Sequence, residues 1–81
     1  MPHETFEGRL IEVIDFFDTK IEERVIEFRD PTLWKHGSFL AISLREGREW
    51  RDAMVSIDPQ VGDIPVRLIL WTVKIAKEIV L

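Results

Sequence analysis

The feature that most constrains this chain is its C-terminal segment, residues 64–81, which is apolar on most sides of a helix. At helical spacing, only Arg67, Lys74 and Glu78 form a coherent polar strip. These charges, together with Lys77, are costly in hydrocarbon, so the segment is not expected to cross a membrane. We therefore expect a helix that is buried in protein and has apolar neighbours on more than one side.

Two apolar stripes divide the surface of this predicted helix. The stripe that faces the protein's own core consists of Ile64, Leu68, Trp71, Ile75 and Ile79. The second stripe consists of Val66, Ile69, Leu70, Val73 and Val80. Because a small sheet covers only one side of a helix, the second stripe is predicted to contact a second copy of this chain or another protein. Two alternatives stay open: residues 64–73 could form a central strand, or the loop around Trp34 could fold over the helix.

A hairpin is predicted over residues 38–57, on either side of a turn at residues 45–48. The residues that share one face are Leu40, Ile42 and Leu44 in the first run and Ala53, Val55 and Ile57 in the second. Gly47 fits the left-handed position of a type I turn that is followed by a bulge. After a second turn, Asp63 is expected to cap the C-terminal helix.

The N-terminal third has two interpretations. Its apolar residues fall within one helical arc of about 100°, the width of a core-facing stripe. They are Phe6, Leu10, Val13, Ile14, Phe17 and Ile21. We expect a helix here. In the rival interpretation, Gly8 disfavours the helix, and residues 9–17 form a strand that pairs with residues 21–29. Residues 22–29 are compatible with either structure, and a strand is favoured.

Together these elements predict a single α+β domain over residues 1–81, consisting of a helix, a three-stranded antiparallel sheet and a C-terminal helix. The alternative is a four-stranded sheet, or a small barrel, with one C-terminal helix.

Few residues in the chain are suited to catalysis. It has no cysteine, which excludes disulfides, thiolate metal sites and cysteine nucleophiles, and it also has no tyrosine. His36 lies near Lys35 and Ser38, but such neighbours are common by chance. We therefore expect no enzyme activity, catalytic residue, metal or cofactor. The N-terminus has neither the basic nor the apolar region of a signal peptide, so a cytoplasmic protein is expected.

Charge is distributed unevenly. Eleven basic and fifteen acidic residues give a net charge of −4, which disfavours non-specific binding to nucleic acid or anionic lipid. On the predicted N-terminal helix, one face would carry Glu4, Asp15, Asp18 and Glu22. This acidic face is predicted to bind a basic partner. A metal site there is disfavoured, because no metal-binding motif accompanies the carboxylates.

The predicted hairpin turn combines arginines with an aromatic residue: Arg45, Arg48, Trp50 and Arg51. Guanidinium groups pair with phosphates and an indole stacks on a base, so nucleic-acid binding is the alternative function. Acidic residues interleave with these bases, which weakens that interpretation. The favoured prediction is a small non-enzymatic protein-protein interaction module, acting as a regulator, adaptor or inhibitor. It is expected to form a homodimer or to bind another protein through the second stripe and the acidic face.

Overall fold

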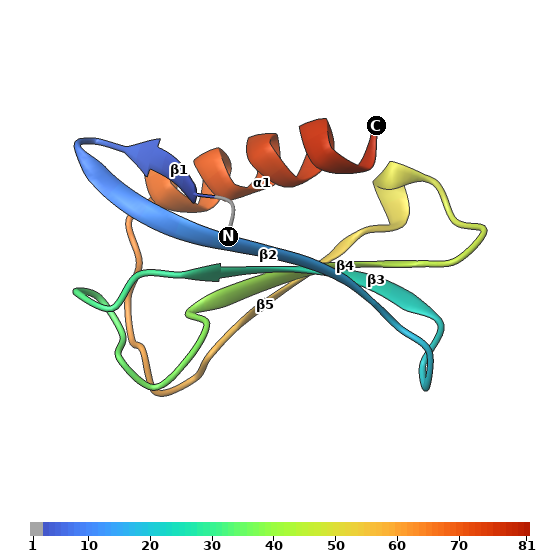
Figure 1. The fold of residues 1–81 in the computed structure, drawn as a ribbon, viewed down its shortest axis with the longest axis horizontal. Coiled ribbons are helices and arrows are strands. Elements are labelled where there is room, and N and C mark those ends of the chain that lie inside the picture. The colour runs from blue at the N-terminus through green and yellow to red at the C-terminus, as the bar shows by residue number, and fades with distance from the viewer. Residues whose placement is uncertain (1–2) are drawn as a thin grey trace.

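The computed structural model describes residues 3–81, which form an antiparallel sheet with one helix across a face (Figure 1). The strands are β1 (His3–Phe6), β2 (Arg9–Asp18), β3 (Glu23–Arg29), β4 (Leu40–Arg45) and β5 (Met54–Ile57). A short 3-10 helix, η1 (Trp50–Asp52), precedes β5, and helix α1 (Val66–Val80) follows it. The strand order is β1-β2-β3-β4-β5, so β1 and β5 are the edges. The predicted α+β class is confirmed, but within residues 3–81 the sheet has five strands rather than three or four.

The predicted N-terminal helix is wrong, because β1 and β2 occupy this part of the chain. They are joined by Glu7 and Gly8, whose φ angles of 49° and 82° fit a type I′ hairpin turn. Leu10, which the helical stripe would bury, is 67% exposed, whereas Ile11, which lay off that stripe, is fully buried. The rival interpretation, a strand at residues 9–17 paired with 21–29, matches the observed pairing of β2 with β3.

The predicted hairpin at residues 38–57 is confirmed as β4 and β5. Leu40 lies opposite Ile57, and Ile42 lies opposite Val55, so these four residues share one face. Gly47 has the expected positive φ of 80°. The connection is longer than the predicted turn, because it also contains η1.

The predicted C-terminal helix is also confirmed, and the alternative of a central strand at residues 64–73 is wrong. The helix residues buried against the sheet are Leu68, Thr72, Ile75 and Ala76. The helix begins one residue after Pro65, which occupies the N-cap position, so the predicted cap at Asp63 is wrong. Because proline fixes its own φ near −65°, it is suited to the start of a helix.

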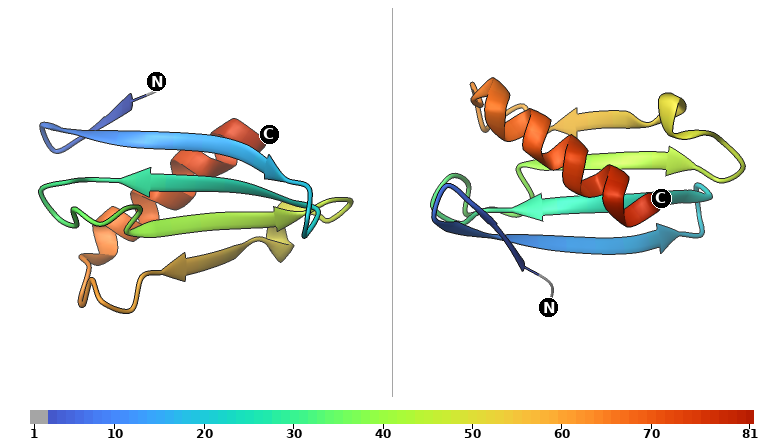
Figure 2. Two further views of the ribbon diagram at one scale, coloured as in Figure 1. Left: turned by 60° about the horizontal axis from the view of Figure 1, so that its bottom comes forward. Right: turned by 90° about the horizontal axis from the view of Figure 1, so that it is seen from above.

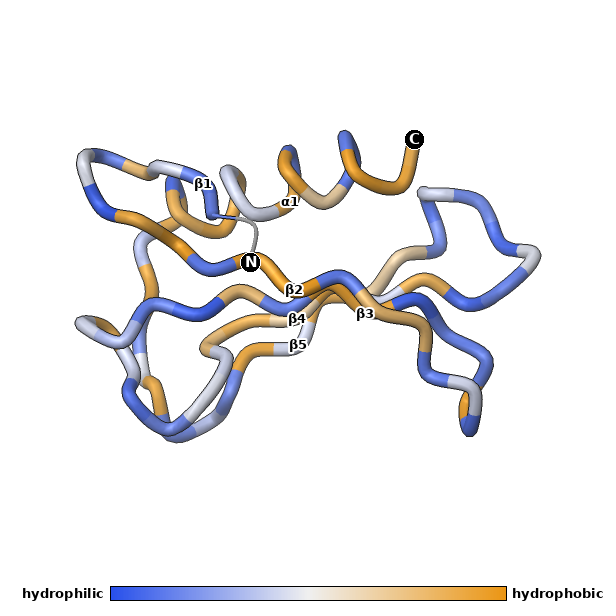
Figure 3. Tube along the Cα trace, in the orientation of Figure 1, coloured by the Kyte–Doolittle hydropathy of each residue, from blue (hydrophilic) through white to orange (hydrophobic). Residues whose placement is uncertain are grey.

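The core lies between α1 and the sheet face that it crosses. The buried sheet residues on this face include Ile11, Val13, Ile26, Phe28, Leu40 and Ile42. The Trp71 ring lies 5.3 Å from that of Phe6 and 6.0 Å from that of Phe28, centroid to centroid. Burial alternates along β2, β3 and β4, as expected when one face of a sheet is covered, and Figure 3 shows the hydropathy of these strands. Seen from the helix side, α1 runs obliquely from the β5 side of the sheet toward β3 and β2 (Figure 2).

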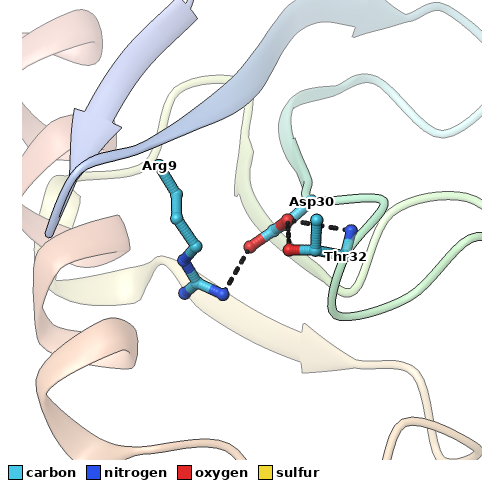
Figure 4. Close-up of polar contacts among 3 residues, drawn as sticks. All are labelled: Arg9, Asp30 and Thr32. Atoms are coloured by element: carbon cyan, nitrogen blue, oxygen red, sulfur yellow. Dashed lines mark hydrogen bonds and ion pairs between the residues drawn. The ribbon is translucent and has the colours of Figure 1, made fainter.

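Two ion pairs fix the end of the sheet where the β1–β2 turn lies. Asp30 is buried, and its carboxylate oxygen Oδ2 lies 3.0 Å from Nη1 of Arg9 (Figure 4). Its Oδ1 accepts hydrogen bonds from the N–H and the hydroxyl of Thr32. On the surface, Arg67 at the start of α1 donates a 2.6 Å hydrogen bond to Glu7, which raises the pKa of Arg67. These contacts hold the loop after β3 and the first turn of α1 to the β1–β2 hairpin.

Candidate interaction surface

The second apolar stripe of α1 is only partly covered by the protein's own residues. Val66 is 70% exposed and Leu70 is 62% exposed, whereas Ile69, Val73 and Val80 are half-buried. Val66, Leu70 and Val73 follow one another at helical spacings of four and three residues, so they form a continuous line along the helix. The N-terminal half of the second stripe therefore remains open to solvent.

Strand β5 adds further exposed apolar side chains. Val55 and Ile57 point to the same face of the sheet as α1, because they lie opposite the buried Ile42 and Leu40. They are nevertheless 44% and 36% exposed. The helix therefore covers the inner part of the sheet but does not fully cover its β5 edge.

The backbone of β5 also presents unpaired groups at this edge. The N–H of Asp58 donates a 3.2 Å hydrogen bond to the carbonyl of Phe39. Along an antiparallel strand, the backbone N–H and C=O groups of successive residues face opposite neighbouring strands. Because the N–H of Asp58 faces β4, the backbone groups of Val55 and Ile57 face away from β4. Within the described residues no further strand pairs with β5. Its outer edge can therefore accept another strand.

A groove joins the helix to this edge. A cavity of about 260 Å³ is lined by Ile42, Trp50, Arg51, Ala53, Met54, Val55 and Val73. It brings Val73 of the second stripe together with Trp50 and Arg51, which the sequence analysis had assigned to a separate nucleic-acid surface. We name the set Val55, Ile57, Val66, Leu70 and Val73 the α1–β5 surface.

Two members of this surface, Val55 and Ile57, were missed as site residues by the sequence analysis. The available signal was the run AMVSI, residues 53–57, which carries no charge although acidic residues lie on both sides of it. An uncharged edge strand lacks the usual protection against pairing.

The four acidic residues predicted to share a helix face are Glu4, Asp15, Asp18 and Glu22. Because β1 and β2 replace the predicted helix, these residues do not share a helix face, and binding of a basic partner by them stays a prediction. Glu4 and Asp15 line a cavity of about 220 Å³ near the end of α1. Asp18 ends β2, and Glu22 lies in the turn before β3 with a φ of 54°. Asp15 accepts two hydrogen bonds from Arg24, which raise the pKa of that arginine.

The predicted nucleic-acid residues are close in sequence but differ in environment. Arg45 and Arg48 are exposed at the end of β4 and in the following turn. Trp50 is half-buried and packs against the core, which leaves less of its ring for stacking. The Arg51 side chain is 84% exposed and lies 3.2 Å from a carboxylate oxygen of Glu49. Nucleic-acid binding by these residues stays a prediction.

Another cavity, of about 330 Å³, lies elsewhere, between β2, β3 and the loop around Trp34. Arg29, on its wall, is shared between Glu12 at 3.8 Å and Glu27 at 3.6 Å. The ring of His36 lies edge-on to that of Trp34, with centroids 4.9 Å apart. Arg29 is therefore held by carboxylates of the protein itself, whereas Nε1 of Trp34 is buried without a hydrogen-bond partner among the described residues.

Within residues 3–81, no three histidine, aspartate or glutamate side chains gather as metal ligands do. In the same part of the chain, α1 is too short and too charged to span a membrane. Comparisons with protein-family models, with curated proteins and with solved structures found no match.

Proposed function

We propose that this protein is a small non-enzymatic protein-protein interaction module, acting as a regulator, adaptor or inhibitor. Its contact region is the α1–β5 surface, and its partner is a second copy of the chain or another protein. The observation that carries the proposal is the exposure of Val66 and Leu70 on α1, together with the outer edge of β5, whose backbone groups are unpaired within the described residues. Exposed apolar surface of this kind, when contiguous, is typical of interaction sites.

Part of the energy that a specific contact requires is available from this surface. Fully burying a valine or leucine side chain is worth about 1.5–3 kcal/mol. Because Val66 and Leu70 are 70% and 62% exposed, covering both would contribute roughly 2–4 kcal/mol to association. Backbone hydrogen bonds at the β5 edge would add direction and register to this gain.

The proposal predicts that Leu70→Glu disrupts binding while the fold is retained, because the Leu70 side chain points mainly into solvent. Leu10→Glu is the matched control, since Leu10 is 67% exposed but lies on β2, away from β5. The wild-type chain and both variants are compared by sedimentation and as bait in affinity capture from the native source. Leu70→Glu should weaken the association at least about tenfold, and Leu10→Glu should not.

The proposal fails if the wild-type chain neither self-associates nor captures any protein in a way that depends on Leu70. An equal loss of association in Leu70→Glu and Leu10→Glu would also contradict it, because it would indicate non-specific association rather than binding through one surface.

A further inference from the structure

The free edge of β5 has an internal symmetry. Val55 and Ile57 both direct their N–H and C=O groups outward, and Ser56 lies midway between them. A second β5 placed antiparallel across a two-fold axis at Ser56 would set each Val55 opposite Ile57 of the other copy. Each of these two pairs could exchange two backbone hydrogen bonds. The edge is therefore complementary to itself, as an isologous dimer contact requires.

The side chains agree with this register. Val55 and Ile57 both lie on the α1 side of the sheet, so the pairing would place β-branched side chains opposite one another there. On the other face, Ser56 would meet Ser56, and no charged residue lies within Met54–Ile57. No like charges would therefore face each other within the paired strands.

The composition of β5 also leaves this edge free to pair, because the nearest charged residues, Asp52 and Asp58, both lie outside the strand. The opposite edge of the sheet, β1, carries Glu4 beside His3, which protects it against pairing.

Building on the proposed function, we infer that the occupant of this edge is a second copy of the chain. The two β5 strands pair antiparallel about Ser56 and join two five-stranded sheets into one continuous sheet. In Figure 2 the N-terminal end of α1 lies on the β5 side of the sheet, so both helices flank the new contact on the same face.

The test is sedimentation of the full chain over a range of micromolar concentrations. Val55→Pro removes an outward N–H and leaves the bonds to β4 intact, since proline is tolerated on an edge where its nitrogen faces solvent. Val55→Lys keeps the backbone donor but places a charge in the contact, and it tests the same contact if the proline variant fails to fold. Leu10→Lys is the control. We expect a wild-type dimer whose dissociation constant rises at least about tenfold in both Val55 variants but not in the control.

Three results would overturn this inference. A wild-type chain that remains monomeric, while its capture of another protein depends on Val55, would assign the edge to a strand of that protein. A dimer lost in Leu70→Glu but unchanged in both Val55 variants would place the contact on the helix alone. Both of these results would retain the proposed function. A monomer with no Leu70-dependent capture would end both proposals.

Discussion

The buried ion pair between Asp30 and Arg9 allows the packing account to be tested quantitatively. The Asp30 side chain is only 2% exposed, and its Oδ2 is 3.0 Å from Arg9, whose own side chain is 42% exposed. Removing one partner of a fully buried pair costs about 3–5 kcal/mol. Because water already reaches Arg9, we expect Arg9→Met to lower the free energy of unfolding by roughly 2–3 kcal/mol. This is a large share of the roughly 5–15 kcal/mol that stabilises a typical domain.

The matched variant is Asp30→Asn, which removes the charge but keeps an oxygen that can accept both hydrogen bonds from Thr32. In this background Arg9→Met no longer leaves a buried charge without a partner. We therefore expect a coupling energy of about 1–2 kcal/mol between the two sites. Urea denaturation followed by tryptophan fluorescence measures all four members of the cycle. If Arg9→Met costs the same free energy with Asp30 and with Asn at this position, the pair does not stabilise the fold as argued.

Three further predictions follow from other parts of the molecule. Ile75→Glu should unfold the protein, because this side chain is 8% exposed, whereas Val73→Glu on the groove wall should give a folded chain with weaker association; circular dichroism and sedimentation distinguish these outcomes. Gly8→Ala should lower stability by about 1–2 kcal/mol in thermal unfolding, since its φ is 82° while a Cβ meets no atom within 4 Å. Arg48→Glu with Arg51→Glu should leave the melting temperature within a few degrees of wild type, because both side chains are exposed. Any nucleic-acid binding should weaken in that double variant, and salt-sensitive binding that persists in it would exclude these arginines as the binding residues.

The sequence predicted the elements that have strong local signals. The hairpin of β4 and β5 has strict alternation around Gly47, and α1 has apolar residues at helical spacing that begin after Pro65. In both cases the periodicity and the turn chemistry agree with each other. The confirmed elements form the half of the chain in which these independent signals coincide.

The N-terminal third was mispredicted because its apolar residues satisfy two periods at once. Leu10, Val13, Ile14 and Phe17 fit a helical stripe, yet the buried residues of β2 are Ile11 and Val13 at a spacing of two. Pairing with β3 decides between the two periods, and that long-range contact is not visible in a local pattern. The turn at Gly8 was the local clue in favour of strands.

The candidate site was predicted only in part. The second stripe of α1 was found from helical spacing alone, and Val66 and Leu70 in it are exposed. The acidic face was predicted from helical spacing, but β1 and β2 occupy this part of the chain, so its four residues do not share a helix face. Whether β5 is an edge depends on the strand order, which the sequence did not reveal.

The most direct test of the central claim is amide hydrogen exchange along β5, measured by NMR with and without the partner. The N–H groups of Ser56 and Asp58 point toward β4, so they should be protected in the isolated chain as well as in the complex. The N–H groups of Val55 and Ile57 point outward, and the account predicts that their exchange slows at least about tenfold on association, whether with a second copy or with another protein. Fast exchange at Val55 and Ile57 under conditions of full association, with unchanged resonances for Val66 and Leu70, would contradict the claim that the α1–β5 surface is where this protein binds.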